Sequence, residues 1–307
     1  MMDKLGAMRI YIAVVESHGF SAAARTLQIP VPTVSRKIAQ LEESLGAQLL
    51  VRSTRSVTTT EPGLRYYEDI KRVLEDIDSA ERLVFGEHRH VKGLLTITAP
   101  KLFGRLHLRP VVNEFMKVHK ELQVRLLFTN QVLDFLEEHI DVGVRIGGTP
   151  GRSMNMEPIG SIRQIVCASP EYLNRCGRPE SPEQLAEHET ITFSQLGAQR
   201  PWVFNHPAKG EYEVKVQARL LVNAAEDAVE SAIQGLGITR LSSYQAANSI
   251  ESGNLEVILE GAEIDPLIVS ILVPGGRHVP QKVDAFIKFA RPALVEKLQN
   301  VSQMCAR

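Results

Sequence analysis

Residues 21–42 have the sequence SAAARTLQIPVPTVSRKIAQLE, and this stretch decides the fold of the N-terminal part. It predicts two short helices joined by a tight turn. On the second helix, apolar residues recur at helical spacing and form a stripe for burial, made of Val34, Ile38, Leu41 and Leu45. The outward face carries small polar and basic side chains, namely Thr33, Ser35, Arg36, Lys37 and Gln40. Such a helix suits the major groove of DNA.

The flanking sequence completes a winged helix-turn-helix. Apolar residues at helical spacing from Leu5 to Val15 predict a preceding helix. Ser21 is expected to cap the next helix with its hydroxyl, and Pro32 fits the first turn of the recognition helix. Gly46 is expected to end that helix. The segment from Gln48 to Thr59 then predicts a short β-hairpin that serves as the wing.

The recognition helix and the wing supply the candidate DNA contacts. We expect base contacts at the start of the helix, from Val31, Pro32, Thr33, Ser35 and Arg36, followed by Gln40. The Arg36 guanidinium can bind two acceptors of guanine, although it could also be a solvated surface arginine. Phosphate contacts, which position the protein without specifying sequence, are expected from Ser21, Lys37, Arg52, Thr54 and Arg55.

A long helix is predicted to start at Thr60, with Pro62 in its first turn. Its apolar residues follow an unbroken heptad spacing: Tyr66, Ile70, Val73, Ile77, Ala80 and Val84. Within a winged helix-turn-helix there is too little other surface to cover such a seam, so we expect pairing with a second copy of the chain. The alternative is a long amphipathic helix that packs only on its own domain.

The sequence changes character after the polar hinge at residues 87–93. Strand-like and helix-like segments alternate from there to the C-terminus, which predicts α/β architecture with parallel sheets covered by helices. The expected elements include a helix at Val132 to Glu138 and a strand at Tyr212 to Val222. The chain therefore combines an all-α N-terminal part, apart from its wing, with a larger α/β part.

Composition and charge restrict the class of protein. The 307 residues are 44% hydrophobic and 23% charged, which is ordinary for a globular protein of two domains. The overall net charge is −1, but residues 1–60 hold seven Lys/Arg and four Asp/Glu. The excess of positive charge thus lies in the segment with the helix-turn-helix. Because this excess is small, we expect that tight DNA binding needs more than one copy of the domain.

Several other kinds of site are not expected. The three cysteines lack metal-ligand spacing and fit free thiols in a reducing compartment, and the pair His88 and His90 fits a solvated hinge better than a metal site. No nucleotide-binding or hydrolase motif is present. We therefore expect no metal, no cofactor and no enzymatic activity. The sequence shows no signal peptide and no apolar span of about 20 residues. We therefore expect the protein in the cytoplasm and not in a membrane.

A series of motifs occurs in a characteristic order along the chain. In the N-terminal part these are residues 21–27, Val34-Ser35-Arg36-Lys37-Ile38, residues 45–49, Arg52-Ser53-Thr54-Arg55 and residues 58–63. In the C-terminal part they are Ala99-Pro100, Phe103-Gly104-Arg105, residues 141–147, residues 167–173 and Gly235-Leu236-Gly237-Ile238. Taken together, their order and spacing resemble the LysR-type transcriptional regulators over the full length.

The resemblance implies a winged helix-turn-helix, a dimerisation helix and an effector domain like a periplasmic binding protein, with a small-molecule cleft between two α/β subdomains. The implied boundaries are 1–60 for the DNA-binding domain, 61–87 for the dimerisation helix, 88–92 for the hinge and 93–307 for the effector domain. Within the effector domain, subdomain I would comprise 93–164 and 268–307, and subdomain II 165–267. The resemblance also implies a dimer of dimers.

Two positions depart from the family pattern. Pro30 and Val31 stand where the family often has Ser or Gln, so Val31 offers only apolar contact, for example with a thymine methyl group. Leu102 stands where the family often has a hydroxyl aimed at the ligand, and Lys101 could compensate for it. Amides at the helix start near Pro100 attract anions. The effector is expected to contact Pro100, Lys101, Leu102, Phe103, Asn130, Gly147, Ser194, Trp202 and Asn223, with Trp202 open to the alternative of a core residue.

These observations predict a regulator that binds promoter DNA and answers to a small-molecule effector. Its expected partners are double-stranded DNA, the effector, further copies of the chain and RNA polymerase. Residues 93–307 alone would also suit a solute-binding protein, but the N-terminal module argues against that. An enzyme with a DNA-binding regulatory head is the other alternative, and no catalytic constellation in the sequence supports it.

Overall fold

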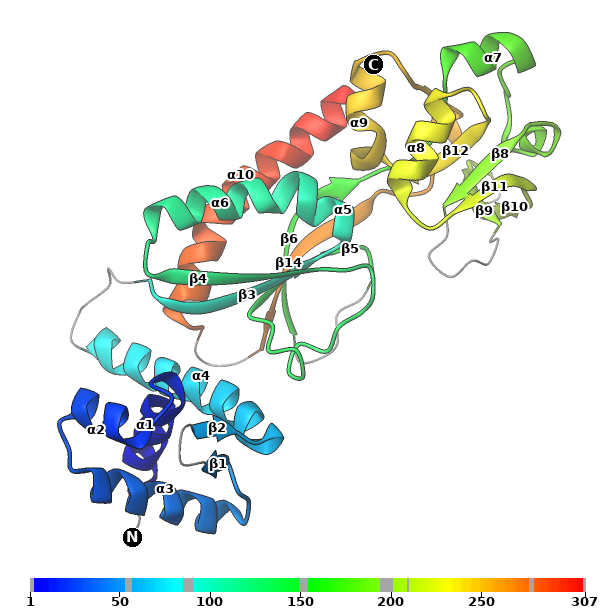
Figure 1. The fold of residues 1–307 in the computed structure, drawn as a ribbon. Coiled ribbons are helices and arrows are strands. Elements are labelled where there is room, and N and C mark those ends of the chain that lie inside the picture. The colour runs from blue at the N-terminus through cyan, green and yellow to red at the C-terminus, as the bar shows by residue number, and fades with distance from the viewer. Residues whose placement is uncertain are drawn as a thin grey trace. The chain divides into compact units, whose positions relative to one another are not determined.

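The computed structural model describes residues 3–52, 57–84, 91–148, 154–193, 201–208, 210–275 and 279–305. Its contacts divide the chain into two units, Met1–His90 and Val91–Arg307, each described separately below. Figure 1 shows the helical N-terminal unit and the α/β C-terminal unit.

The N-terminal unit is a helical bundle with a small antiparallel hairpin. Its elements are α1 (Lys4–Glu16), α2 (Phe20–Leu27), α3 (Val31–Leu45), β1 (Leu50–Arg52), β2 (Val57–Thr59) and α4 (Glu61–Val84). As predicted, α3 carries Pro32 in its first turn and ends at Gly46 in the left-handed conformation, with φ +64°. The cap prediction for Ser21 is wrong. Helix α2 begins two residues earlier than predicted, at Phe20, with Gly19 as its N-cap, so Ser21 lies within the first turn.

The core of the N-terminal unit forms where α1, α3 and α4 meet. Val34, Ile38 and Leu41 are fully buried, which confirms the predicted stripe on α3. The buried Tyr11 donates a hydrogen bond from its hydroxyl to the Gly63 carbonyl at 3.0 Å. This bond ties α1 to the first turn of α4, where glycine leaves room for the close approach.

The C-terminal unit contains two five-stranded sheets. The first has the order β4-β3-β5-β14-β6 and is built from β3 (Gly93–Ala99), β4 (Leu122–Phe128), β5 (Val142–Ile146), β6 (Met154–Ile162) and β14 (Leu267–Pro274). Its helical segments are α5 (Lys101–Phe103), a π-helical turn (Gly104–Leu108), α6 (Arg109–Val118) and α10 (Gln281–Met304). Figure 1 shows α6 and α10 on one side of this sheet.

The second sheet has the order β11-β8-β12-β7-β13. Its strands are β7 (Gln164–Ala168), β8 (Thr190–Phe193), β11 (Ala218–Val222), β12 (Ile238–Ser242) and β13 (Glu256–Ile258). A separate hairpin consists of β9 (Trp202–His206) and β10 (Gly210–Val214). The helices are α7 (Pro170–Cys176), α8 (Ala225–Ile233) and α9 (Ser243–Glu251), with 3₁₀ turns at Pro182–Glu187 and Glu260–Ala262.

The predicted sheets differ from the observed ones in strand direction. β3 runs parallel to β4 and β5, and β8 runs parallel to β11 and β12, as expected. However, β14 is antiparallel to β5 and β6, and β7 is antiparallel to β12 and β13. Both sheets are therefore mixed. The chain passes from the first sheet to the second between β6 and β7 and returns before β14, and the strands at these crossings run against their neighbours.

Two expected elements also differ, and one helix was not expected. Residues 132–138 do not form the expected helix. They contain a single turn, in which the Asp134 carboxylate accepts hydrogen bonds from the Leu136 and Glu137 amides at 2.7 and 3.1 Å, and the turn ends at His139 with a left-handed φ of +51°. The strand expected over residues 212–222 is broken into β10 and β11. Helix α9 was not predicted, and it begins with a capping box between Ser242 and Gln245.

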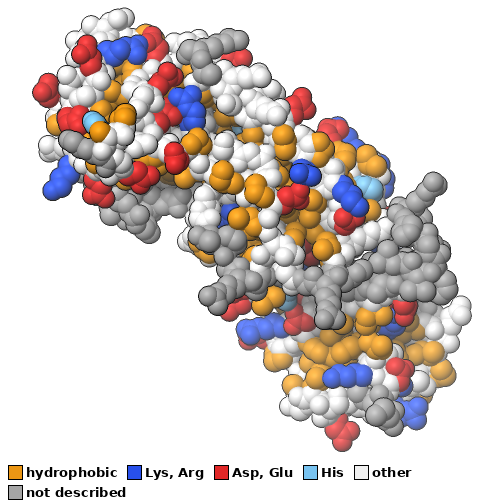
Figure 2. All heavy atoms as spheres, turned by 180° about the vertical axis from the view of Figure 1, so that it is seen from behind, with side chains coloured by type: hydrophobic (Ala, Val, Ile, Leu, Met, Phe, Trp, Pro, Cys, Tyr) orange, Lys and Arg blue, Asp and Glu red, His pale blue; other side chains and the backbone are white. Residues whose placement is uncertain are grey.

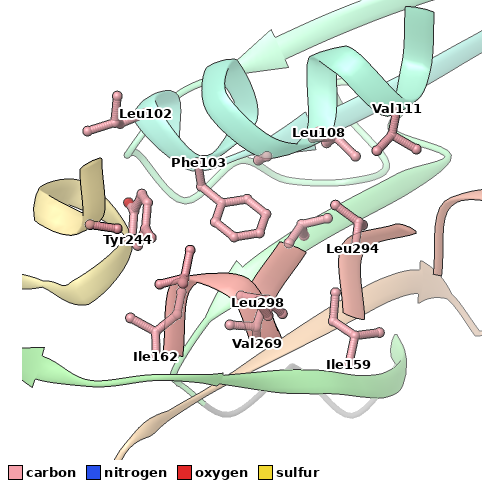
Figure 3. Packing of buried hydrophobic residues seen from close by; sticks show 14 of the residues in the cluster. Leu102, Phe103, Leu108, Val111, Ile159, Ile162, Tyr244, Val269, Leu294 and Leu298 are labelled. Carbon is pink, nitrogen blue, oxygen red and sulfur yellow. The ribbon is translucent and has the colours of Figure 1, made fainter. Parts of the chain in front are cut away.

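The two sheets of the C-terminal unit share one hydrophobic core. Phe103 and Tyr244 meet edge to face with ring centroids 5.5 Å apart, and both belong to a cluster that includes Leu298 of α10 and Ile162 of β6. Figure 3 shows Phe103 and Tyr244 facing each other above Leu298 and Val269. The core thus continues from one sheet to the other.

Candidate functional site

The exposed surface of α3 combines the predicted base-contacting residues. Pro32, Arg36 and Gln40 are exposed and follow each other at intervals of four, which places them on one face of the helix. Val31 is 40% exposed at the start of α3. Thr33 and Ser35 are half-buried at the borders of this face. The surface offers a guanidinium, an amide and small apolar groups to a partner.

The predicted phosphate contacts have different surroundings. Ser21 is exposed on α2. The Lys37 ammonium lies 3.9 Å from the carboxylate of Asp3, the residue that caps α1. Thr54 and Arg55 lie outside the described residues, and so does the side chain of Arg52, whose backbone ends β1.

Helix α4 uses part of its predicted dimer seam within the N-terminal unit. Ile70 is buried in the unit's core, and the Tyr66 ring packs 5.8 Å from the ring of Tyr11. The prediction that these two residues face a partner is therefore corrected: α1 already covers them. Val73 is 49% exposed and Ile77 is half-buried, whereas the side chains of Ala80 and Val84 lie outside the described residues.

Helix α4 has an exposed apolar residue on each of two opposite flanks, Leu64 on one and Val73 on the other. Leu64 and Val73 are each 49% exposed and lie nine residues apart, which corresponds to half a turn around the helix. The flank with Leu64 also carries Glu68 and Lys71, whereas the flank with Val73 continues to Ile77. Figure 2 shows that hydrophobic side chains reach the surface of the N-terminal unit. The apolar flank of α4 is the one that contains Val73.

The start of α5 brings three predicted effector residues together. Pro100 precedes the helix as its N-cap, and the Lys101 amide donates a hydrogen bond to the Asn130 side-chain oxygen at 2.9 Å. Phe103 points into the core shared by the two sheets, whereas Leu102, which is also buried, points away from Phe103 in Figure 3. The prediction that they contact the effector is therefore wrong, because both side chains are buried by packing on their neighbours.

The remaining predicted effector residues are dispersed. Trp202 is buried in a cluster beneath the β9–β10 hairpin, so the alternative of a core residue is correct for it. Gly147 follows β5 with φ +65°, and its amide donates to the Ile268 carbonyl at 2.8 Å. Asn223 is exposed after β11, and Ser194 lies outside the described residues.

Contacts between the subdomains involve residues that the sequence did not single out. Arg105 forms an ion pair of 3.0 Å with Glu226 of α8, and both side chains are partly exposed. The His107 ring packs against both Phe103 and Tyr244, with centroid distances of 5.0 and 5.8 Å, so the three rings form a triangle. Burial, together with the charge of Lys297, lowers the pKa of His107 to about 4. The neutral ring therefore belongs to the apolar junction.

The described residues give no sign of a membrane span or of a metal site. Among the described residues, no helix is long and apolar enough to cross a membrane. Within the same part of the chain, no group of three or more His, Cys, Asp or Glu residues is arranged to hold a metal ion.

Comparison with known proteins accounts for both units. Residues 5–64 match the bacterial regulatory helix-turn-helix protein, lysR family, and residues 88–295 match the LysR substrate binding domain. The chain belongs to the LysR family of transcriptional regulators. Members combine a helix-turn-helix that binds DNA with a domain that binds a small molecule, and this LysR-type regulator is an effector-modulated regulator of transcription that forms oligomers.

Relatives with this organisation cover nearly the whole chain. The regulator is 31% identical to the uncharacterized HTH-type transcriptional regulator YhjC of Escherichia coli strain K12, over 97% of this chain and all of that one. It is similar to the full-length Vibrio cholerae virulence activator AphB, with a TM-score of 0.59 and 28% identity over 94% of this chain and 98% of that one. CrgA from Neisseria meningitidis gives the same TM-score and identity, with 95% and 98% covered.

Proposed function

We propose that the start of α3 reads promoter DNA through Val31, Pro32, Thr33, Ser35, Arg36 and Gln40. The observation that carries this proposal is the exposed series Pro32, Arg36 and Gln40 on a helix whose other face is fully buried. In the major groove, the Arg36 guanidinium binds two acceptors of one guanine, and Gln40 reaches a neighbouring base edge. Val31 contributes an apolar contact to a thymine methyl group.

Phosphate contacts hold the helix in its register on the DNA. Ser21 at the start of α2 and Lys37 on α3 supply two of them, and Arg52, Thr54 and Arg55 of the wing supply the others. Lys37 leaves its 3.9 Å contact with Asp3 to reach a phosphate, and the partial exposure of its side chain supports that step. Such contacts add affinity for any DNA sequence and weaken as salt rises.

Pairing of two chains through α4 places two recognition helices on one stretch of DNA. The exposed Val73 on the apolar flank supports this pairing, with Ile77, Ala80 and Val84 following along the same helix. We propose that dimers associate further into a dimer of dimers, and that the DNA-bound assembly contacts RNA polymerase. Its place of action is the cytoplasm, where the DNA is, and its role is regulatory and not enzymatic.

The effector binds near the start of α5, between the two subdomains. The pairing of the Lys101 amide with Asn130, and the neighbouring ion pair of Arg105 with Glu226, support this location. Pro100, Gly147, Ser194 and Asn223 complete the proposed set. The effector shifts the equilibrium between two arrangements of the domain and thereby changes DNA binding. The size of that shift is set by the difference between its affinities for the two arrangements.

Selection of bound genomic fragments, followed by gel shifts at fixed salt, tests the DNA-binding role. We expect the full-length protein to enrich discrete fragments and to prefer them over scrambled sequence. Arg36→Ala should lower that preference by about tenfold, because a guanine contact contributes ~1–3 kcal/mol of discrimination. Arg109→Ala, at an exposed position of α6 in the other unit, is the control and should leave it unchanged. Equal losses on selected and scrambled DNA would contradict the base-reading role of Arg36.

A further inference from the structure

The first sheet of the C-terminal unit has a cavity on the face away from its core. Along β5, Val142 and Val144 point into the hydrophobic core, so Gly143 and Arg145 face the other side. On this side β5, β6 and β14 border a cavity of about 740 Å³, together with the turn at residues 132–136. That volume lies within the range of about 300–1,000 Å³ that is typical of small-molecule sites.

The wall of this cavity is mostly apolar. Ile268 and Met156 are 51% and 45% exposed there, and Val132 is 92% exposed on the neighbouring turn. Leu272 and Met154 extend the same wall. Apolar side chains from three strands and a turn thus converge on one hollow, which is the usual composition of a site for the carbon skeleton of a ligand.

One cationic group faces this apolar wall, the guanidinium of Arg145. Within the described part of the chain it makes no hydrogen bond and no ion pair, and its buried Nη2 has no partner. Desolvation lowers the pKa of Arg145. The lining also contains a carboxylate, that of Asp134, which accepts hydrogen bonds from the amides of its own turn. A cation that is half-buried and has a buried, unpaired Nη2 is costly, and a ligand anion would offset that cost.

The geometry points to a second ligand site at Arg145, one that binds a small amphipathic carboxylate with an aryl or short alkyl body. The carboxylate pairs with the planar guanidinium, which suits two parallel hydrogen bonds, and the apolar body lies against Met156 and Ile268. This site is on the face of the sheet away from Phe103 and α6, and it shares only the border residue Gly147 with the effector set proposed at the start of α5. A ligand here contacts β14, the strand that returns from the second subdomain.

The test measures anion binding by the full-length protein. The fluorescent sulfonate 8-anilinonaphthalene-1-sulfonate reports binding, and octanoate and octan-1-ol compete with it. We expect octanoate to displace the dye at concentrations at least about tenfold lower than octanol, since only octanoate offers a charge-assisted hydrogen bond. Equal competition by octanol would overturn the proposal, because it would reduce the site to an apolar surface without a role for the charge.

Variants assign the binding to Arg145. Arg145→Met should weaken octanoate binding at least about tenfold, whereas Arg125→Met, at an exposed position of β4 in the same sheet, should leave it unchanged. Ser270 is the cross-strand neighbour of Arg145, so Ser270→Asp places a carboxylate beside the guanidinium and should also abolish octanoate binding. Circular dichroism identifies which variants fold. Unchanged octanoate binding in either folded variant would overturn the site.

Discussion

The Arg163 guanidinium donates two hydrogen bonds of 2.7 Å to the Glu263 carboxylate. A further N–H of the same group donates to the Cys305 carbonyl at 2.9 Å. Arg163 lies where the chain passes from the first sheet to the second, Glu263 precedes its return, and Cys305 follows α10. One side chain therefore joins both crossings to the C-terminal helix.

Removal of this link should destabilise the C-terminal unit. Arg163→Met leaves the largely buried Glu263 without its partner, and we expect the free energy of unfolding to fall by about 2–4 kcal/mol. Urea denaturation followed by circular dichroism measures the change. Arg291→Met breaks a more exposed pair with Glu157 and should cost less than about 1 kcal/mol. If both variants cost the same, the Arg163 link has no special role in stability.

The close approach at Gly63 should make that position intolerant of a side chain. A Cβ added there would lie 2.0 Å from the Leu49 carbonyl oxygen and 2.9 Å from the Tyr11 hydroxyl. We expect Gly63→Ala to lower the free energy of unfolding of the N-terminal unit by about 1–3 kcal/mol. Gly19→Ala has open space around the added carbon and should cost less than about 1 kcal/mol. Thermal melting of both variants separates the effect of the clash at Gly63 from the effect that a glycine-to-alanine change has without a clash.

The two flanks of α4 should respond differently to a charge. Val73→Lys introduces an ammonium on the apolar flank, where dimerisation would bury it, so we expect dimer dissociation to become at least about tenfold more favourable. Leu64→Lys is equally exposed but lies on the polar flank and should leave assembly unchanged. Sedimentation velocity at several concentrations gives the dissociation constants. Dissociation caused by Leu64→Lys alone would assign the interface to the opposite flank.

Burial of His107 should make stability depend on pH. The folded-state pKa of about 4 lies below the ordinary value of about 6.5. As pH falls from about 6.5 to 4, the unfolded chain binds a proton that the folded chain does not, so the free energy of unfolding decreases over this window. His107→Phe should reduce the proton uptake on unfolding by up to about one. Proton uptake that stays the same in folded His107→Phe would assign the pH dependence to another group.

Arg36 should also contribute to the salt dependence of DNA binding. Its charge releases counterions when it enters the groove, so Arg36→Ala should make the slope of log affinity against log salt shallower, by up to about one. Gln40→Ala removes no charge and should leave that slope unchanged. Fluorescence anisotropy at five salt concentrations measures both variants. An unchanged slope for Arg36→Ala would place its guanidinium away from the DNA.

The sequence predicted those parts of the fold whose signal is local. The stripe on α3 was correct because helical spacing alone decides which of its residues are buried. Helix α9 was missed because its buried face consists largely of Ala and Ser, which carry little hydrophobic signal. Conversely, residues 132–138 have a helical pattern but form only one turn, because the backbone leaves the helical conformation at His139, where φ is +51°.

The candidate sites were harder to predict than the fold. Leu102 and Phe103 follow directly after residues near the proposed effector site, and only their burial in the cluster that includes Tyr244 and Leu298 shows that they belong to the core. The sequence did not predict a binding role for Arg145. That role depends on the missing hydrogen-bond partner of its buried Nη2, which only a structure shows.

The hydrophobic core that joins Phe103 to Tyr244 has an evolutionary consequence. A fragment made of residues 165–267 alone would expose one half of this core to water, so the second subdomain cannot be exchanged between proteins as a separate module. New ligand specificities in this chain are accessible through the loops at strand ends, or through replacement of the whole C-terminal unit. Exchange of a single subdomain would require the partner surface to change at the same time.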